Sequence, residues 1–363
     1  MIEQISIKNY KSIRRIEGLP LRRINVLIGE NGAGKSNFIS FFEMLNAIYE
    51  RRFGQYILQR GGIERFINFQ ASADESIFCL MDFDNKNALS LNIIPSQTGK
   101  GIISNFSHFF NEHADKYKNY RNWNDITLDS DVEESDILSD HSKRMSYVKK
   151  QLASFKVYHF HDTSLKSPMR GPSVMGDYEM LRSDASNLAA WLYRLKHTDI
   201  TGFQLIEGTL KSVAPYFRKF HLEPDAINPL QIKLEWEEED SDRYLDGYSF
   251  SDGTIRFVAL AALLLSEQRP GVILIDEPEL GLHPAAMTKL AAMIRRASQK
   301  SQIIVSTQSA AFIDEFDSED IVVVERNEEG AVFHRLDDIK LDSWRSNYSL
   351  GELWRKNVLG GRP

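Results

Sequence analysis

The feature that most constrains this chain is a glycine-rich run, Gly29-Glu-Asn-Gly-Ala-Gly-Lys-Ser36, which lies between two apolar segments. Residues 24–28 (INVLI) have the composition of a buried strand, and residues 36–49 carry apolar side chains at helical spacing. The run matches the pattern G-x-x-x-x-G-K-[ST], in which glycines let backbone N–H groups converge on a phosphate. A strand, a turn and a helix in this order predict a phosphate-binding loop.

The side chains of the loop have separate roles in this prediction. Lys35 is expected to bring a flexible positive charge to the β- and γ-phosphates of a nucleotide, and the helix N-terminus adds its own positive end. The hydroxyl group of Ser36 is an expected ligand of Mg²⁺. The residues expected to contact the nucleotide here are Gly29, Asn31, Gly32, Ala33, Gly34, Lys35, Ser36 and Asn37.

A second apolar segment, residues 272–276, ends in two carboxylates, Asp276 and Glu277. The carboxyl ends of buried strands form the edge at which α/β folds bind ligands. We therefore expect Asp276 to hold Mg²⁺, directly or through water, and Glu277 to polarise the attacking water as general base. A strand that ends in Asp-Glu is also common for structural reasons alone, and the phosphate-binding loop is what favours the catalytic interpretation.

Two further motifs surround this strand in the sequence. Phe250-Ser251-Asp-Gly253-Thr opens an expected helix over residues 254–267, and Ser251 is a good N-cap. The alternative is that Ser251, the Gly253 backbone and the helix dipole form a second phosphate-binding surface. The strand QIIVST ends in Thr307, and the next residue, Gln308, can contact a γ-phosphate or position water.

The composition is that of an ordinary globular chain. It has 44 basic and 51 acidic residues, a net charge of −7, and 42% hydrophobic residues. These values exclude collagen-like, wholly disordered and uniformly basic chains, although a local basic patch stays possible. One cysteine, the lack of a secretory signal pattern and apolar runs no longer than residues 257–265 lead us to expect a cytoplasmic protein without membrane attachment.

Two groups of residues could be interpreted as metal sites. The acidic run over residues 129–136 lacks the glycine and terminal glutamate of a calcium loop, so a solvated surface loop is the favoured interpretation. His159 and His161 share one face of an expected strand, but the sequence offers no third ligand nearby. We do not expect a metal at either place.

Taken in order, these motifs resemble the ABC-type ATPase heads of the RecF, SMC and overcoming-lysogenisation-defect (OLD) group. The segments that carry the resemblance are ISIKNYKSI, INVLIGENGAGKSNFI, FSDGT in the signature position, LIDEPELGLHP and STQS. The tracts YHFHDTS, NLAAWLYRL and ELWRKNVLGGRP resemble stand-alone bacterial AAA-family ATPases of this group. The resemblance implies a mixed α/β P-loop NTPase sheet flanked by helices, with ATP and Mg²⁺ as cofactors.

The chain departs from the pattern of the group at several positions. Asp252 stands where a small residue usually follows the signature serine, and a carboxylate there would repel a γ-phosphate, so Asp252 is expected to point away or to cap the helix. Gln308 stands where the group usually has histidine, and it cannot accept a proton from water, which implies slow hydrolysis. Gln70 is the candidate for the Q-loop, with a plain surface glutamine as the equal alternative.

The resemblance also implies an organisation for the whole chain. Residues 1–96 and 156–363 are expected to form one discontinuous ATPase head, because each part carries half of a single ATP site. Residues 97–155 are expected to be a polar, partly helical insertion. One chain carries one phosphate loop and one signature, so a head-to-tail homodimer with two sandwiched ATP molecules is expected.

Several biological roles fit such a head. The leading hypothesis is ATP-driven control of a separately encoded effector, with a Toprim-like nuclease as the first candidate, in DNA repair or anti-phage defence. Because only about 50 residues of the sequence follow Gln308, we expect the effector to be a separate chain. The alternatives are a low-turnover ATP-binding scaffold, a transporter ATPase subunit, and a RecF-like DNA clamp or loader that uses Arg14, Arg22, Arg23, Arg51 and Arg52.

Overall fold

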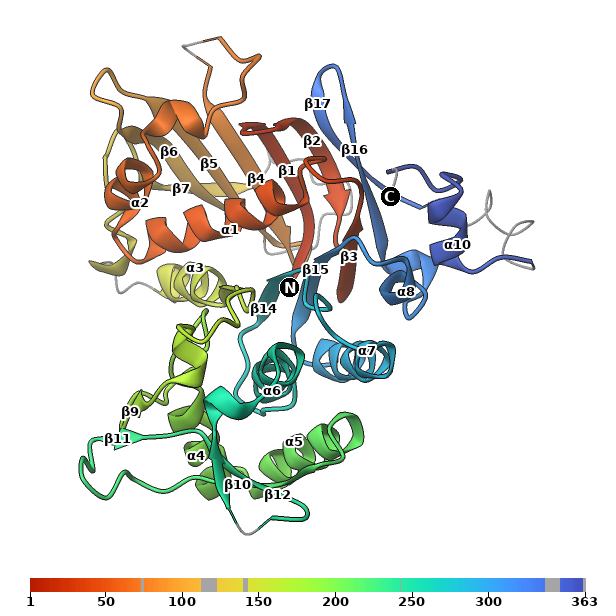
Figure 1. Ribbon diagram of the computed structural model, residues 1–363. Helices are drawn as coiled ribbons and strands as arrows, with labels where there is room; N and C mark the ends of the chain where they lie inside the picture. Colours follow the sequence, from red (N-terminus) through yellow and green to blue (C-terminus); the bar gives the residue numbers. More distant parts are fainter. Residues whose placement is uncertain (73–74, 112–122, 140–142, 242, 337–346, 362–363) are drawn as a thin grey trace. The chain divides into compact units, whose positions relative to one another are not determined.

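The structure is a computed structural model that describes residues 1–363 except 73–74, 112–122, 140–142, 242, 337–346 and 362–363 (Figure 1). The described chain forms two compact units. Unit 1 comprises residues 1–157, 271–274 and 304–363, and unit 2 comprises residues 158–270 and 275–303. The expectation that residues 1–96 and 156–363 form one discontinuous ATPase head stays a prediction.

Most residues of a six-stranded sheet belong to unit 1. The sheet is built from β3 (Ile24–Ile28), β8 (Phe155–Tyr158), β14 (Val272–Asp276), β15 (Gln302–Thr307), β16 (Ile321–Asn327) and β17 (Gly330–Arg335). The order across the sheet is β17-β16-β3-β15-β14-β8. β16 pairs parallel with β3 and antiparallel with β17. Every residue of β3 and β15 is buried, as the apolar sequences predict for strands covered on both faces.

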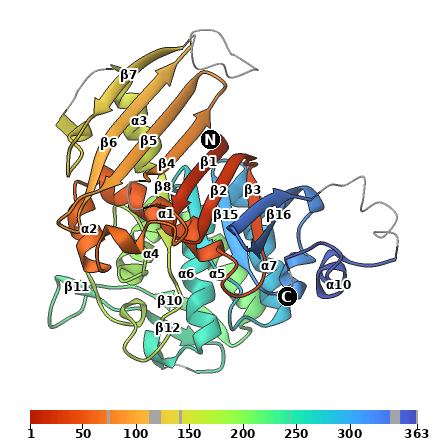
Figure 2. The ribbon, with the colours of Figure 1, turned by 90° about the horizontal axis from the view of Figure 1, so that it is seen from above.

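A second sheet of unit 1 is antiparallel throughout. Its strands lie side by side in the order β2-β1-β4-β5-β6-β7 (Figure 2). Two of them, β6 and β7, come from residues 97–155, for which the sequence predicts a polar, partly helical insertion and in which the structure has strands as well as helix α3. The bounds are β1 (Ile2–Tyr10), β2 (Ile13–Pro20), β4 (Ile77–Phe83), β5 (Asn87–Pro95), β6 (Gly101–Phe110) and β7 (Asn124–Asp129).

The helices of unit 1 include α1, which follows β3 directly and buries the predicted apolar face. The bounds are α1 (Lys35–Tyr49), α2 (Phe53–Gln59), α3 (Lys143–Ala153), α8 (Ala310–Ile313), α10 (Leu350–Arg355), and the 3₁₀ turns η1 (Ile63–Arg65), η3 (Ile137–Ser139) and η6 (Ser318–Asp320). On α1, the ring of Phe42 lies 5.6 Å from that of Phe38 and 5.5 Å from that of Phe155 between centroids. This aromatic group anchors α1 in the core.

Helix α2 is capped at its start by a residue from a distant part of the chain. The Glu134 carboxylate accepts the backbone N–H groups of Phe53 (2.9 Å) and Gly54 (2.6 Å), and so satisfies two donors at the helix start. The cap comes from about 80 residues further along the chain. The sequence around α2 therefore cannot predict this cap.

Unit 2 is mainly helical, with two small sheets. The bounds are β9 (Ser173–Val174), β10 (Phe217–His221), β11 (Gln231–Ile232), β12 (Glu235–Glu238), β13 (Tyr244–Asp246), α4 (Leu188–Thr198), α5 (Ile200–Val213), α6 (Asp252–Leu264), α7 (Pro284–Ser298), and the 3₁₀ turns η4 (Pro168–Arg170) and η5 (Gly247–Ser249). Residues 255–264 of α6 are all buried, because α4, α5 and α7 pack around this helix. Within the ranges that the structure describes, no helix has the length and apolar composition that crossing a bilayer requires.

We expect Phe42→Ala to lower the free energy of unfolding by about 3–5 kcal/mol, because it leaves a cavity between α1 and Phe155. Phe42 is 0% exposed. Urea unfolding followed by circular dichroism measures the loss. Leu58→Ala on α2 is the matched control, since Leu58 is 52% exposed, and should change the value by less than about 0.5 kcal/mol. A Phe42→Ala loss as small as the control would contradict this core assignment.

A pH-dependent effect is expected at Asp320. Burial raises the pKa of its carboxyl group to about 6, and the charges of Asp317 and Glu319 act in the same direction. In the unfolded chain the pKa is about 4, so ionised Asp320 destabilises the folded state as pH rises through 6. Asp320→Asn should therefore raise the free energy of unfolding at pH 8 by about 1 kcal/mol, and the gain should vanish below about pH 4. Urea titrations of both proteins at pH 4, 6 and 8 measure it, and a pH-independent difference would contradict this cause.

Candidate functional site

The predicted phosphate-binding loop joins β3 to α1 in unit 1. Gly32 and Gly34 have φ angles of 80° and 123°, in the left-handed region that favours glycine. A Cβ atom on Gly34 would lie 2.6 Å from Ala331 Cβ and 2.9 Å from Ser12 Oγ. The loop therefore needs glycine at this position both for its backbone angles and for its close packing.

Lys35 is only 4% exposed, and its ammonium group lies inside the loop. Nζ donates to the main-chain oxygens of Gly29 (2.6 Å) and Glu30 (3.0 Å). Ser36, the next residue, has an exposed side chain at the start of α1. The loop thus combines a buried cation with an exposed hydroxyl group, which are the two side-chain groups that a Mg²⁺–triphosphate requires of it.

The other candidate residues around the loop have defined positions in unit 1. Asn37 Nδ2 donates to Ser12 Oγ (2.7 Å) and ties the first turn of α1 to the β1–β2 turn. Gln70 is exposed, and its amide donates to the main-chain oxygen of Glu328 in the β16–β17 turn. The Q-loop assignment of Gln70 stays a prediction.

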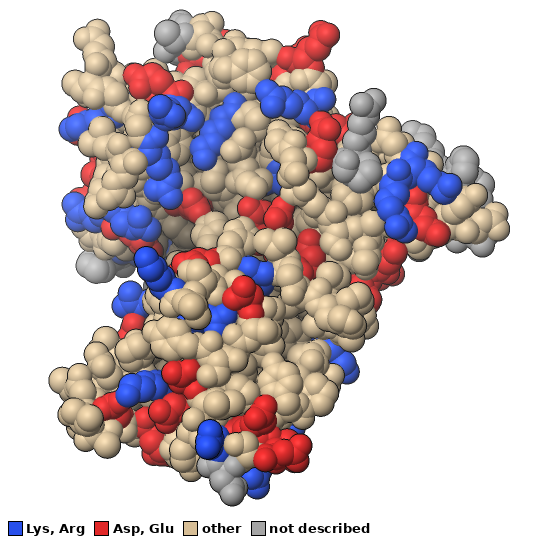
Figure 3. All heavy atoms as spheres, viewed as in Figure 1, with Lys and Arg blue, Asp and Glu red and all other residues tan. Residues whose placement is uncertain are grey.

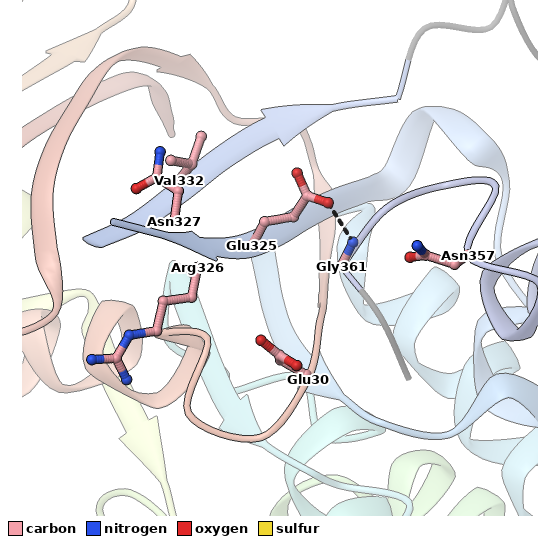
Figure 4. Close-up of a pocket in the computed structure, with 7 residues that line it drawn as sticks. All are labelled: Glu30, Glu325, Arg326, Asn327, Val332, Asn357 and Gly361. Atoms are coloured by element: carbon pink, nitrogen blue, oxygen red, sulfur yellow. Dashed lines mark hydrogen bonds between the residues drawn. The ribbon is translucent and has the colours of Figure 1, made fainter. Parts of the chain in front are cut away.

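A cavity of about 480 Å³ lies beside the loop (Figure 4). Glu30 contributes to its lining from the loop, and Asn357 and Gly361 contribute from the C-terminal segment. The carboxylate of Glu325 accepts the N–H of Gly361 (2.8 Å), and a Cβ atom on Gly361 would lie 3.4 Å from Gly29 Cα. The C-terminal segment therefore supports the start of the loop, a contact that the sequence does not reveal.

In unit 2, the FSDGT segment forms the start of α6. Ser251 Oγ accepts the N–H of Thr254 (3.2 Å), which confirms the N-cap expectation. A Cβ atom on Gly253 would lie 2.6 Å from the main-chain oxygen of Gly281, so only glycine fits this contact with the turn after β14. The phosphate-binding role of Ser251 and Gly253 stays a prediction.

Asp252 points its carboxylate at a residue that the sequence analysis did not single out. Arg170 Nη2 lies 2.7 Å from Asp252 Oδ1, and the side chains are 2% and 71% exposed respectively. In the sequence, Arg170 is an ordinary basic residue in a loop rich in serine, proline and glycine, where a solvated side chain is the usual case. Its burial is a result of tertiary folding.

The two carboxylates at the end of β14 lie on a tight turn of unit 2. Glu277 has a φ angle of 42°, which is uncommon for a residue with a side chain and costs free energy. Leu280 N donates to the main-chain oxygen of Glu277 (3.2 Å) and closes the turn. Strain of this kind is concentrated at functional sites, and it favours a functional interpretation of Glu277.

A second buried arginine, Arg256 on α6, holds this turn. Its guanidinium donates to the main-chain oxygens of Phe160 (2.8 Å), His161 (3.0 Å) and Leu280. Burial lowers the pKa of Arg256. The donor atoms therefore connect the segment after β8 to the turn that carries Glu277.

His161 also contacts this turn, because its Nε2 lies 2.8 Å from the main-chain oxygen of Asp276. The ring centroids of His159 and His161 are 6.3 Å apart. Across the described ranges, no three or more His, Cys, Asp or Glu side chains are grouped to hold a metal ion. His161 thus has a structural contact in this unit.

Gln308 follows the last residue of β15 in unit 1 and is half-buried. Ser309 N donates to Thr307 Oγ1 (2.9 Å), and Ser309 Oγ accepts the N–H of Phe312 (3.2 Å) at the start of α8. These bonds define the backbone on both sides of Gln308. The residue lies directly at a strand end, where the sequence predicts it.

The buried lysine in a glycine-rich loop between β3 and α1, beside a sheet with parallel and antiparallel pairs, defines a mixed α/β P-loop NTPase fold. Residues 24–314 match the family described as "AAA domain, putative AbiEii toxin, Type IV TA system", and the chain belongs to that family. No curated protein sequence shows a significant match to the chain.

Solved structures confirm the expected fold. An SMC head bound to the C-terminal winged-helix domain of ScpA is similar with a TM-score of 0.60 and 14% identity, over 93% of this chain and 98% of that chain. A Pyrococcus furiosus SMC head with an extended coiled coil, bound to the C-terminal domain of ScpA, is similar with a TM-score of 0.57 and 14% identity, over 95% and 98%. At this identity the likeness shows the fold alone, which is that of an SMC head domain.

Proposed function

We propose that this protein binds and hydrolyses ATP and that ATP-driven pairing of two copies controls a separate effector protein. The observation that carries the proposal is the buried ammonium of Lys35 inside the β3–α1 loop. A positive charge surrounded by main-chain polar groups at a helix N-terminus is suited to a polyphosphate. Membership of an AAA-domain family supports the same nucleotide chemistry.

The proposed catalytic roles follow the chemistry of each side chain. Lys35 binds the β- and γ-phosphates, and Ser36 and Asp276 hold Mg²⁺, which supplies charge neutralisation when bound. Glu277 is the general base that accepts a proton from water. Gln308 orients that water or contacts the γ-phosphate, and since an amide cannot take up the proton, slow turnover is expected.

Pairing of two copies is proposed because one chain carries one loop and one FSDGT segment. In this proposal Ser251 and Gly253 of one copy contact the γ-phosphate bound by the other, and Gln70 acts as the Q-loop residue. The similar SMC heads are bound to domains of ScpA, which supports a protein partner for this chain as well. The family description, which names a type IV toxin–antitoxin system, supports a defence role. The first candidate effector in this proposal is a separately encoded Toprim-like nuclease, which follows from the resemblance to the OLD group.

The distribution of charge favours a protein effector over a DNA clamp. Arginines that could contact DNA form ion pairs with carboxylates, which lowers their combined attraction for phosphate: Arg14–Glu75, Arg22–Glu319, Arg51–Asp136 and Arg52–Glu50. Figure 3 shows basic side chains interspersed with acidic ones on the face that it presents. ATPase and DNA-retention assays at several salt concentrations test the alternative, because a steep salt dependence of retention would favour DNA binding.

We expect Lys35→Ala to weaken ATP binding about 100-fold, because a charged donor to the phosphates is lost. Isothermal titration calorimetry with Mg²⁺–ATP measures the Kd. Lys300→Ala is the matched control, since Lys300 is an exposed lysine paired with Glu267, and it should leave the Kd unchanged. Wild-type affinity in Lys35→Ala would show that this loop is not the nucleotide site.

Glu277→Gln should keep ATP binding and lower the hydrolysis rate about 100-fold or more, because glutamine cannot act as a base. The variant should therefore accumulate as an ATP-bound dimer, which light scattering after size-exclusion chromatography detects. Glu267→Gln, at an exposed carboxylate, serves as control. Hydrolysis by Glu277→Gln at the normal rate would show that the base is another group, and a monomer with ATP bound would argue against pairing.

A further inference from the structure

We propose that Arg170 is the positioning residue of the segment 247–252 and that it compensates the charge of Asp252 beside the phosphate that this segment binds. The inference rests on the proposed function, in which the start of α6 contacts the nucleotide of a second copy. All the contacts that carry it lie within unit 2. Arg170 itself does not touch the nucleotide in this proposal.

The guanidinium of Arg170 uses all three of its nitrogens, and most of their contacts are main-chain oxygens. Nε donates to Thr163 O (2.9 Å), and Nη1 donates to Gly247 O (2.9 Å) and Phe250 O (2.7 Å). Arg170 is only 3% exposed. A planar fork with five N–H donors can hold several oxygens in fixed directions, which the single ammonium of lysine cannot do.

The backbone of this segment is adapted to the arginine. A Cβ atom on Gly247 would lie 2.8 Å from the main-chain oxygen of Arg170, so a larger residue there would push the two chains apart. On its other side the segment is held by an aromatic stack, in which the rings of Trp236 and Phe250 lie 4.5 Å apart and nearly parallel at 11°. Since the stack does not depend on the charge, we expect the segment to stay folded when Arg170 is replaced.

The negative charge that Arg170 compensates is that of Asp252. Asp252 is the first residue of α6, next to the N-cap Ser251, and its side chain is exposed whereas that of its partner Arg170 is buried. A carboxylate in this place competes with a phosphate for the positive end of the helix and repels it. The ion pair at 2.7 Å cancels that charge and holds the carboxylate to one side. This pair explains how the chain can have aspartate where the group has a small residue.

The test uses the full chain in the Glu277→Gln background, where light scattering measures the ATP concentration that gives half-maximal dimer. With Arg170→Met, this concentration should rise about 10-fold, while ATP binding to the monomer stays unchanged. Adding Asp252→Asn should recover at least about 3-fold of the loss, because the uncompensated carboxylate is gone. The loss should also shrink at high salt, since repulsion at an exposed group is screened.

Other outcomes would overturn the inference. A double variant as poor as Arg170→Met, or a loss that does not change with salt, would leave Arg170 with only a structural role. If Arg170→Met does not fold, the single variant Asp252→Asn provides the test. It leaves the positive charge of Arg170 uncompensated, so the ATP concentration for half-maximal dimer should fall below that of the Glu277→Gln parent. An unchanged or higher concentration would contradict the inference. Failure of the Glu277→Gln parent to dimerise with ATP would instead contradict the proposed function.

Discussion

One kind of interaction stabilises three loops of the two units: a buried cation that donates to main-chain carbonyl oxygens. Lys35 holds the oxygens of Gly29 and Glu30 inside the β3–α1 loop. Arg170 does the same for the segment before α6, and Arg256 for the turn after β14. Because a loop has few backbone bonds of its own, these cations supply the hydrogen bonds that a helix or sheet would otherwise provide.

The same arrangement has a consequence for ligand binding. A buried charge is costly unless polar groups solvate it, and carbonyl oxygens do so without cancelling it. The loop around Lys35 therefore keeps a positive charge that attracts an anion. The segment around Arg170 differs, because there the aspartate at the start of α6 neutralises the guanidinium. Arg170 thus both pairs with the charge of Asp252 and holds the main chain of the segment before α6.

Local patterns predicted much of the fold. The apolar runs predicted β3, β14 and β15, the helical spacing of apolar residues predicted α1, and the N-cap serine of the FSDGT segment predicted the start of α6. Long-range contacts left no such pattern. Glu134 caps α2 from a distant segment, and the C-terminal Gly361 reaches Glu325 beside the loop. The resemblance to SMC heads predicted the fold class, which structures at 14% identity confirm.

By itself, the sequence determined where the chemistry-bearing groups lie along the chain: Lys35 and Ser36 after one buried strand, Asp276 and Glu277 at the end of another. Glycine spacing and apolar runs depend only on neighbouring residues, so they can be recognised directly in the sequence. Only the tertiary structure decided that Arg170 is buried and paired with Asp252 and that Glu277 has a strained backbone. An arginine in a polar loop has the same local sequence whether it is solvated or enclosed, and the difference comes from segments far along the chain that fold around it.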